Sequence, residues 1–195
     1  DAAGFFKLLQ PEQWGGLQAD PTMFFEAVRR IASACGSTGW AGGILGVHNW
    51  HLAQFDQQAQ EDVWADDPTV RVSSSYAPMG AGVVVDGGYL VNGTWLWSSG
   101  CDHATWTFAG GPVIKDGRPV DFGSFLMPLG DYQIRDDWNV VGLKATGSNT
   151  LIVKDVFGPR HRFLSDGAMN DGTAGGLKTN TAAVYRMPWG TMHPT

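Results

Sequence analysis

The sequence predicts an α+β protein in which a helical region is followed by a β-rich region. Apolar residues recur with helical spacing in the first third of the chain, at Phe24, Val28 and Ile31. From about Val70 the period changes to the alternation of strands, interrupted by two-residue turn pairs. A hydrophobic content of 43% over 195 residues is enough to bury a substantial core. We expect a partial helical domain at residues 1–68, a β domain at 69–164 and a connector at 165–195.

Two helices are framed by residues that cap their ends. Asp20 supplies an N-cap side chain, Pro21 suits the first helical position, and Gly36 is predicted to end this helix. Asp56 can cap a shorter helix, QQAQEDVWA, which closes the helical region near residue 68.

The helix between these two is rich in glycine. It is predicted to start after Ser37 or Thr38 and to run to about Gln54. Its glycines are Gly39, Gly42, Gly43 and Gly46. Each costs about 1 kcal/mol of helix propensity relative to alanine. A face without side chains allows close approach, so we expect another backbone or a flat cofactor against it.

The β region predicts an antiparallel sheet, closed as a barrel or a sandwich. VVVDGGYLVNGTWLWSSG indicates hairpins with turns at Asp86-Gly87 and Asn92-Gly93. The same pattern continues through TWTFAGGPVI, the turn KDGRP, VDFGSFLMP and NTLIVKDVF, giving five or six strands. After residue 164 the chain becomes glycine-rich, which is typical of a connector.

Composition limits the possible partners. A net charge of -6 and a pI of about 5.2 leave no basic surface for nucleic acid. No apolar stretch approaches the roughly 18 residues of a membrane span. The two cysteines, Cys35 and Cys101, form no disulfide framework and no CxxC pair. We therefore expect a cytoplasmic protein without membrane or nucleic-acid partners.

The histidines are the main candidates for chemistry. His48 and His51 lie three residues apart on the predicted glycine-rich helix, and one helical face could chelate a metal. Further ligands would have to come from Cys101, His103 or an acidic residue at no recognisable spacing, so we expect no metal. Neighbouring Cys101 and His103 rarely face each other in a loop, which disfavours a nucleophile there. His193 and His161 carry no motif and are expected at the surface or in the connector.

Four blocks of sequence carry a family resemblance. They are GSTGWAGGILGVHNWHLAQF, SSSYAP, DGGYLVNGTWLWSSGCDHATW and WNVVGLKATGSNTLIVKDVF, in this order. The chain resembles the oxygenase components of two-component flavin monooxygenases with the acyl-CoA dehydrogenase fold. It is most similar to the branch that hydroxylates a phenolic seco-steroid in actinobacterial cholesterol degradation.

The resemblance implies a reaction and its partners. A separate NADH-dependent flavin reductase would deliver reduced FMN or FAD. The reduced flavin would react with oxygen and form a flavin C4a-hydroperoxide. This species hydroxylates a phenol next to its hydroxyl group. The family is usually a homotetramer, and a C-terminal helical bundle of the fold is absent from this sequence.

The resemblance also assigns residues to flavin and substrate. The flavin contacts are Trp40, Ser74, Ser75, Tyr76, Trp97, Ser98 and Ser99. Ser98 is expected beside flavin N5, or else it is only a hydroxyl that ends a strand. His48 is expected to polarise the phenol proton, or else it is a buried histidine satisfied by a backbone carbonyl. His51 and His103 are expected to line the substrate pocket.

One departure separates the chain from acyl-CoA dehydrogenases proper. Their acidic signature T-E-P-x-A-G-S-D is replaced here by SSSYAPMGAG, which argues against a thioester substrate. Two alternatives remain open at this point. One is a flavin oxidoreductase that acts on a thioester, and the other is a noncatalytic β domain whose tryptophans bind sugars or aromatic rings.

Overall fold

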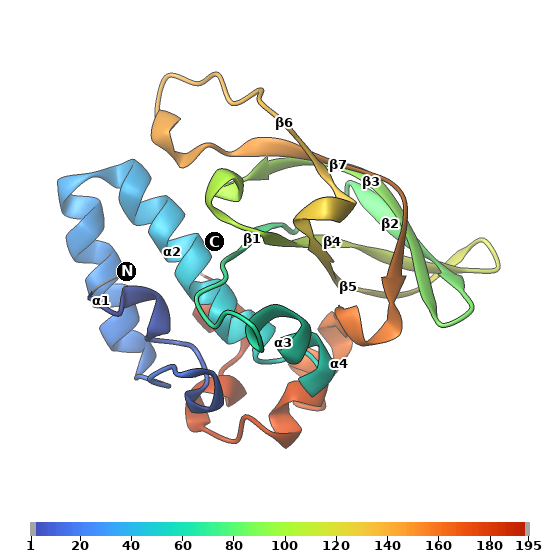
Figure 1. The fold of residues 1–195 in the computed structure, drawn as a ribbon, viewed down its shortest axis with the longest axis horizontal. Helices are drawn as coiled ribbons and strands as arrows, with labels where there is room; N and C mark the ends of the chain where they lie inside the picture. The colour runs from blue at the N-terminus through green and yellow to red at the C-terminus, as the bar shows by residue number, and fades with distance from the viewer. Residues whose placement is uncertain (1–2, 194–195) are drawn as a thin grey trace.

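The computed structural model describes residues 3–193 and has a helical layer packed beside one curved sheet (Figure 1). The longer helices are α1 (Pro21–Ala34), α2 (Gly36–Leu52) and α3 (Gln57–Trp64). All strands follow these three helices in the sequence, so the predicted α+β ordering is confirmed.

Helices α1 and α2 are separated by a single residue. The Asp20 side chain caps α1 as predicted and accepts a hydrogen bond from the Thr22 amide at 2.8 Å. The helix ends at Ala34, earlier than the predicted stop at Gly36. Cys35 is extended and α2 starts at once at Gly36, without a side-chain cap, so the predicted start after Ser37 or Thr38 is wrong.

The glycines of α2 accommodate α1. A Cβ atom at Gly39 would lie 2.4 Å from the Cβ of Ala32, and one at Gly46 would lie 2.6 Å from the ring of Phe24. Both distances are far below van der Waals contact, so the helices approach as closely as their backbones allow. The glycine face therefore receives another helix, as one of the two expectations had it.

The sheet has eight strands and mixed direction. They are β1 (Val72–Ser75), β2 (Gly80–Val85), β3 (Gly88–Ser98), β4 (Trp106–Lys115), β5 (Arg118–Pro128), β6 (Gln133–Arg135), β7 (Asn149–Pro159) and β8 (Phe163–Ser165). Their order is β6-β7-β3-β2-β4-β5-β8, and β1 pairs with β4. Strands β1 and β2 both run parallel to β4, so the prediction of an antiparallel sheet is wrong for these two pairings.

One of the two predicted turns in β2 and β3 is correct. Asp86-Gly87 joins these strands, and Gly87 has a φ of 76°. Asn92-Gly93 lies inside β3, where the pairing with β7 shifts register. The Asn92 side chain accepts a hydrogen bond from the Asp155 amide at 2.8 Å, and the Trp95 ring fills the space beside Gly93. The Asn92-Gly93 pair thus forms a bulge inside a long strand, although its composition is typical of a turn.

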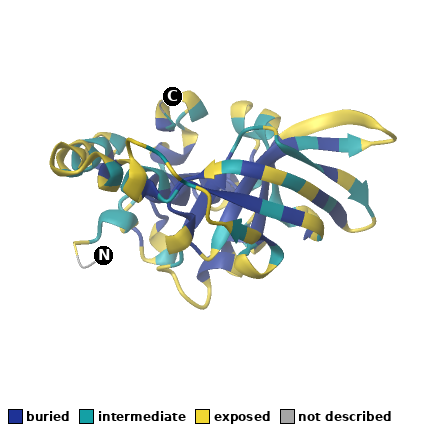
Figure 2. Cartoon of the chain, turned by 90° about the horizontal axis from the view of Figure 1, so that it is seen from above, coloured by how far each residue is buried: buried dark blue, intermediate teal, exposed yellow. Residues whose placement is uncertain are grey.

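Buried residues lie along the sheet and where the helices meet it (Figure 2). Their apolar members form two clusters. One lies inside the curved sheet and includes Trp95 and Phe125. The other joins the helices to the sheet and includes Trp50, Phe108 and Tyr185. The second half of α2 is buried on all sides in this cluster, so its polar side chains lie in the interior.

Within residues 166–192, the part from Ala174 onward packs against the end of α2. The range contains α4 (Asp166–Asn170), α5 (Trp189–Met192) and two 3-10 turns. The Trp50 indole donates to the carbonyl of Val184 at 2.8 Å, and the Asn180 amide donates to Ala53 at 2.9 Å. This segment thereby closes one side of the helical core.

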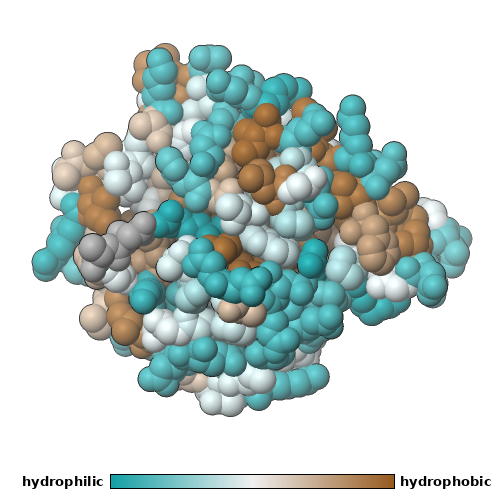
Figure 3. Space-filling model, in the orientation of Figure 1, coloured by the Kyte–Doolittle hydropathy of each residue, from teal (hydrophilic) through white to brown (hydrophobic). Residues whose placement is uncertain are grey.

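The surface combines apolar patches with polar side chains (Figure 3). On the sheet, Val83, Leu90 and Phe157 lie in one row across β2, β3 and β7, and Val83 and Phe157 are exposed. Among the described residues, no helix combines the length and the hydropathy that crossing a membrane requires.

Candidate active site

Helix α2 and strands β1 and β3 meet at the predicted site. His48 and His51 lie in the buried half of α2 and face β1. The Ser75 hydroxyl at the end of β1 donates to the carbonyl of Leu96 in β3 at 2.6 Å. Strand β1 therefore links the two histidines to the end of β3, where Trp97 and Ser98 lie.

His48 is fully buried and held by one hydrogen bond. Its Nδ1 lies 2.5 Å from the carbonyl oxygen of Val72, so Nδ1 carries the proton. Burial lowers the pKa of His48 to about 4, although this hydrogen bond opposes the shift. Nε2 finds no hydrogen-bond partner among residues 3–193. His48 is thus a buried histidine bonded to a backbone carbonyl, as the alternative to a catalytic role expected. This carbonyl satisfies only one of its two ring nitrogens.

His51 is equally buried and bonds to Tyr76. Its Nδ1 lies 2.8 Å from the Tyr76 hydroxyl oxygen, while its Nε2 has no partner in the described part of the chain. Burial holds the pKa of His51 well below its usual value, helped by the neighbouring imidazoles of His193 and His48. Burial raises the pKa of Tyr76 well above its usual range. Both groups are therefore neutral.

Aromatic rings enclose the two histidines. The Phe108 ring centroid lies 4.5 Å from that of His51 and 5.4 Å from that of His48. His193 stacks on Trp189 at 3.8 Å and lies 6.0 Å from both other imidazoles. His193 lies within the range 165–195 that was expected to be a connector, but α5 brings its ring onto the core, where burial lowers its pKa to about 3.

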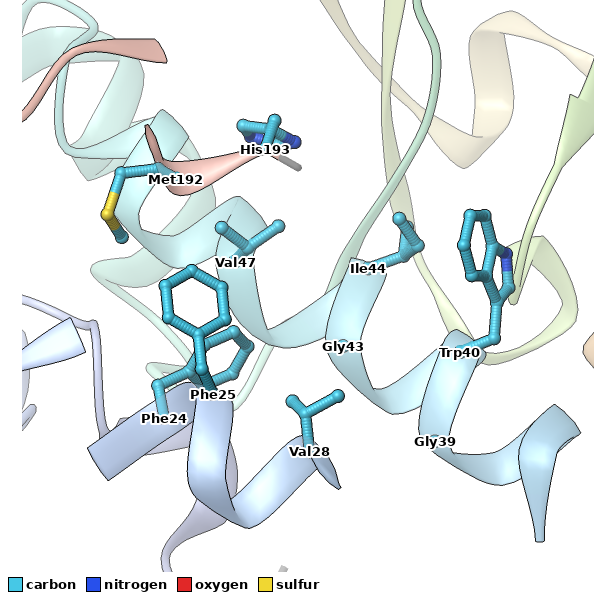
Figure 4. Close-up of a pocket in the computed structure, with 10 residues that line it drawn as sticks. All are labelled: Phe24, Phe25, Val28, Gly39, Trp40, Gly43, Ile44, Val47, Met192 and His193. Carbon is cyan, nitrogen blue, oxygen red and sulfur yellow. The ribbon is translucent and has the colours of Figure 1, made fainter. Parts of the chain in front are cut away.

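A cavity of about 180 Å³ opens between α1 and α2 beside these rings (Figure 4). It is lined by Phe24, Phe25, Val28, Gly39, Trp40, Gly43, Ile44, Val47, Met192 and His193. Only Trp40 and His193 bring polar side-chain atoms to this wall. The cavity is therefore suited to an apolar molecule.

The end of β3 has a special backbone. Trp97 has a φ of 66°, a left-handed conformation that is unusual for a large residue, and its side chain is 60% exposed. The pairing with β7 shifts register between Trp95 and Ser98. The Ser98 hydroxyl is buried and has no hydrogen-bond partner that the structure describes. Strain and an unsatisfied buried hydroxyl at one place are typical of a functional site.

Neighbouring hydroxyls are already engaged in the protein. The Trp40 indole donates to the Ser99 oxygen at 2.9 Å, and this oxygen lies 2.8 Å from that of Ser148. This chain of bonds ties α2 to the ends of β3 and β7. Trp40 thus brings α2 to the end of β3.

The remaining candidates lie apart from this cluster. His103 is exposed and lines a different hollow of about 330 Å³ together with Thr38, Leu45 and Arg71. Burial, with Asp102 nearby, raises the pKa of the Cys101 thiol to about 11, which disfavours a thiolate nucleophile. In the range 3–193 no three metal-ligating side chains gather into a possible metal site. The structure therefore unites His48 with His51 but not with His103.

Comparison with known proteins shows which enzymes this chain resembles. No family model matches the chain. It is 77% identical over all 195 residues to the flavin-dependent monooxygenase oxygenase subunit HsaA of Mycobacterium tuberculosis. It is 73% identical over 192 residues to the HsaA of Rhodococcus jostii. The chain is thus similar over its whole length to part of the flavin-dependent monooxygenase oxygenase subunits. It spans about half the length of these relatives, 50% in both cases.

Solved structures show the same fold for these oxygenase subunits. The crystal structure of the HsaA monooxygenase from M. tuberculosis matches 99% of this chain and 51% of its own, with 77% identity and a TM-score of 0.98. XiaF from Streptomyces sp., solved with FADH2 and glycerol, matches 96% of this chain and 48% of its own, with 28% identity and a TM-score of 0.84.

The residues at the end of β3 fit the flavin that defines this monooxygenase family. The Ser98 hydroxyl is free to bond a ring nitrogen or carbonyl, and the exposed indole of Trp97 offers an apolar wall. The hydroxyls of Ser75 and Ser99 are already bonded within the protein, so they shape the surface around Ser98. Sequence reasoning missed Ser148 and Val72, because their roles depend on contacts between distant segments.

Proposed function

We propose that this protein hydroxylates a phenolic ring next to its hydroxyl group, with reduced flavin and oxygen. The observation that carries the proposal is the buried Nε2 of His48, a bare acceptor without a partner in the described chain. A buried acceptor of this kind needs a ligand that brings a proton. A phenol brings one, and its apolar ring suits the aromatic surroundings of His48.

His48 would act on the phenol through a hydrogen bond. The phenol hydroxyl donates to Nε2, and the electron density at the ortho carbon increases as the proton moves toward nitrogen. His48 is neutral at physiological pH because burial lowers its pKa to about 4. The residue is therefore always ready to accept this bond.

Flavin would be held at the end of β3. Ser98 would bond the edge of its ring system near N5, Trp97 would cover the ring, and Trp40, Ser99, Ser74, Ser75 and Tyr76 would shape the surroundings. The bound reduced flavin, FMN or FAD, supplies the activation of oxygen. The apolar walls around His48 exclude water from the space where the phenol binds.

A steroid-like phenol is the substrate that we propose. The cavity between α1 and α2 offers apolar surface from Phe25, Val28 and Ile44 for an alicyclic body. A relative from Rhodococcus sp. RHA1 that is 72% identical to this chain was solved under the name 3-HSA hydroxylase.

Further proposals concern partners and assembly. The relatives are named oxygenase subunits, which supports a separate flavin reductase as a partner. We propose that this reductase uses NADH and that both proteins are cytoplasmic. We propose a homotetramer, in which another subunit covers the exposed apolar side chains of Val83 and Phe157. We also propose an acyl-CoA dehydrogenase-like fold with a further helical bundle, and the division into residues 1–68, 69–164 and 165–195.

Product analysis tests the activity. The protein expressed from its complete reading frame is supplied with reduced FMN or FAD, oxygen and a phenol, and the products are separated by chromatography. We expect a catechol with one oxygen atom from O₂. Oxidation of an acyl thioester instead of the phenol would favour the dehydrogenase alternative, and failure to bind flavin would favour the noncatalytic β domain.

A further inference from the structure

Strand β3 has a second bulge, at Leu96 and Trp97, directly before Ser98. The pairing of β3 with β7 includes Trp95 and Ser98 but passes over the two residues between them. Trp97 takes a φ of 66° at this point. A bulge redirects the side chains that follow it. The Trp97 indole is therefore exposed, while the Ser98 hydroxyl is buried.

The backbone N–H and C=O of Leu96 bond to side chains. The pairing of β3 with its other neighbour, β2, ends at Gly93. The Ser75 hydroxyl donates to the Leu96 carbonyl at 2.6 Å, and the Leu96 amide donates to the thioether sulfur of Met79 at 3.4 Å. Ser75 ends β1 and Met79 directly precedes β2. One short connecting segment thus bonds both backbone groups of Leu96.

Met79 is fixed beside β3 by its own backbone. Its carbonyl accepts a hydrogen bond from the Thr94 amide at 3.3 Å. Its side chain packs against the apolar cluster inside the sheet. The next residue, Gly80, lies so close to β3 that a Cβ atom there would be 2.3 Å from the Trp95 ring. These contacts hold the sulfur at the Leu96 amide.

We propose that Ser75 and Met79 are positioning residues, which together clamp the backbone of Leu96. The clamp holds Trp97 in its left-handed conformation, so that its indole and the Ser98 hydroxyl stay where flavin would bind. Such a conformation is unfavourable for a large residue and persists only where its surroundings fix it. The inference rests on the proposed function, because flavin is the proposed ligand of this strand end. It assigns Met79 a role that depends on its sulfur as an acceptor and not only on its volume.

Hydrogen exchange tests the clamp without any flavin. The protein is expressed from its complete reading frame, and mass spectrometry follows overlapping peptides that contain the Leu96 amide. Met79→Leu removes the acceptor but keeps an apolar side chain, and we expect this amide to exchange about 5-fold faster than in the wild type. Met79→Gln offers an acceptor oxygen on a side chain of similar length and should restore the protection.

A second methionine in the same apolar cluster provides the matched control. Met127→Leu removes a sulfur from this cluster, in strand β5, and should leave exchange of the Leu96 amide unchanged. Equal exchange of this amide in the wild type and in Met79→Leu would overturn the proposal. Faster exchange in Met127→Leu as well would also overturn it, because the effect would then follow from loosened packing.

Affinity for reduced flavin, titrated without oxygen, tests the consequence of the clamp. We expect Ser75→Ala and Met79→Leu each to weaken binding of reduced FMN or FAD by about 5-fold, and Met79→Gln to bind like the wild type. Both contacts hold one residue, so the double variant Ser75→Ala/Met79→Leu should lose less affinity than the product of the two single effects. A loss equal to this product, or unchanged affinity in both single variants, would overturn the proposal.

Failure of the proposed function would look different. If the wild type binds no reduced flavin, the proposed function fails, and the flavin role of Ser75 and Met79 fails with it. Slow exchange of the Leu96 amide would then show that the clamp itself is present. Flavin binding by the wild type together with an unprotected Leu96 amide would overturn the clamp alone.

Discussion

The Nδ1 atom of His48 lies 2.5 Å from the carbonyl oxygen of Val72, and this contact gives the imidazole its chemical character. It joins the buried half of α2 to the first residue of β1. Because a carbonyl only accepts, it fixes the proton on Nδ1 and exposes the lone pair of Nε2 to the interior. The contact therefore both packs the helix on the sheet and prepares an acceptor for a ligand.

Replacing glycines in α2 tests the packing against α1. Gly39→Ala should destabilise the protein by about 1–3 kcal/mol, because its Cβ would lie 2.4 Å from the Cβ of Ala32. Gly42→Ala is the matched control, since its Cβ would lie 3.5 Å from the Phe5 ring, an ordinary contact. It should stabilise the protein by up to about 1 kcal/mol through helix propensity. Urea unfolding measures both, and equal effects would contradict the packing argument.

Ser98→Ala tests whether the Ser98 hydroxyl binds flavin or stabilises the fold. The Ser98 hydroxyl has no partner in the part of the chain that the structure describes, so its removal should leave the free energy of unfolding unchanged or slightly higher. Affinity for reduced flavin should fall by about 5- to 10-fold, because the bond near N5 is lost. In Ser148→Ala the hydroxyl bonded to Ser99 is lost, and stability should fall by about 1 kcal/mol. Unchanged flavin affinity in Ser98→Ala would remove that residue from the site.

Trp40→Phe tests the bond that joins α2 to the end of β3. The change keeps an aromatic ring but removes the indole donor to Ser99, at 2.9 Å. We expect a loss of about 1 kcal/mol in the free energy of unfolding. Trp138→Phe is the control, because its indole bonds an exposed carbonyl within its own loop. A Trp40→Phe protein as stable as the wild type would show that this contact does not hold the elements together.

Asp166 makes stability depend on pH. Burial, with Asp121 nearby, raises the pKa of Asp166 to about 6 from an ordinary value of 3.8. The folded state therefore holds this proton more tightly than the unfolded state. Its contribution is fully present below pH 3.8 and is lost as the pH rises through about 6. Because the carboxyl is half-buried and screened by solvent, the loss should be at most about 1 kcal/mol.

Asp166→Asn measures this effect. The variant should be more stable than the wild type at pH 7 and should lack the decline between pH 4 and 6. Asp136→Asn, at an exposed position, is the control and should follow the wild type. Parallel pH profiles for Asp166→Asn and the wild type would contradict the assignment.

Local signals in the sequence predict much of this fold. Asp20 and Pro21 mark the start of α1, and Asp86-Gly87 marks the hairpin of β2 and β3, because caps and turns depend on neighbouring residues. Parallel pairing of β1 and β2 with β4 could not be predicted in this way. It joins strands that are distant in sequence, and nothing in a strand's own residues specifies its partner. The Asn92-Gly93 pair has the composition of a turn, and only the pairing of β3 with β7 shows that it forms a bulge inside a strand.

In the candidate site, too, some features follow from local sequence and others only from tertiary contacts. The spacing of His48 and His51 places them on one face of a helix, and this was visible in the sequence. Their proton positions depend on Val72 and Tyr76, which are brought to α2 only by the fold. His193 reaches the same cluster from the far end of the described chain, with no motif around it. Sequence patterns thus indicate which residue types are available, and tertiary contacts decide which atoms are left free.

The acceptor role of His48 Nε2 is tested most directly by two substitutions of this residue. The measured quantity is the amount of catechol formed per oxygen consumed. His48→Asn can keep a donor to Val72 but has no atom at the position of Nε2, whereas His48→Gln places an amide there. We predict that His48→Asn stays folded and still consumes oxygen, while phenol hydroxylation falls by about 10²–10⁴-fold and His48→Gln retains more of it. Catechol yields in His48→Asn equal to those of the wild type would contradict the central role of this acceptor.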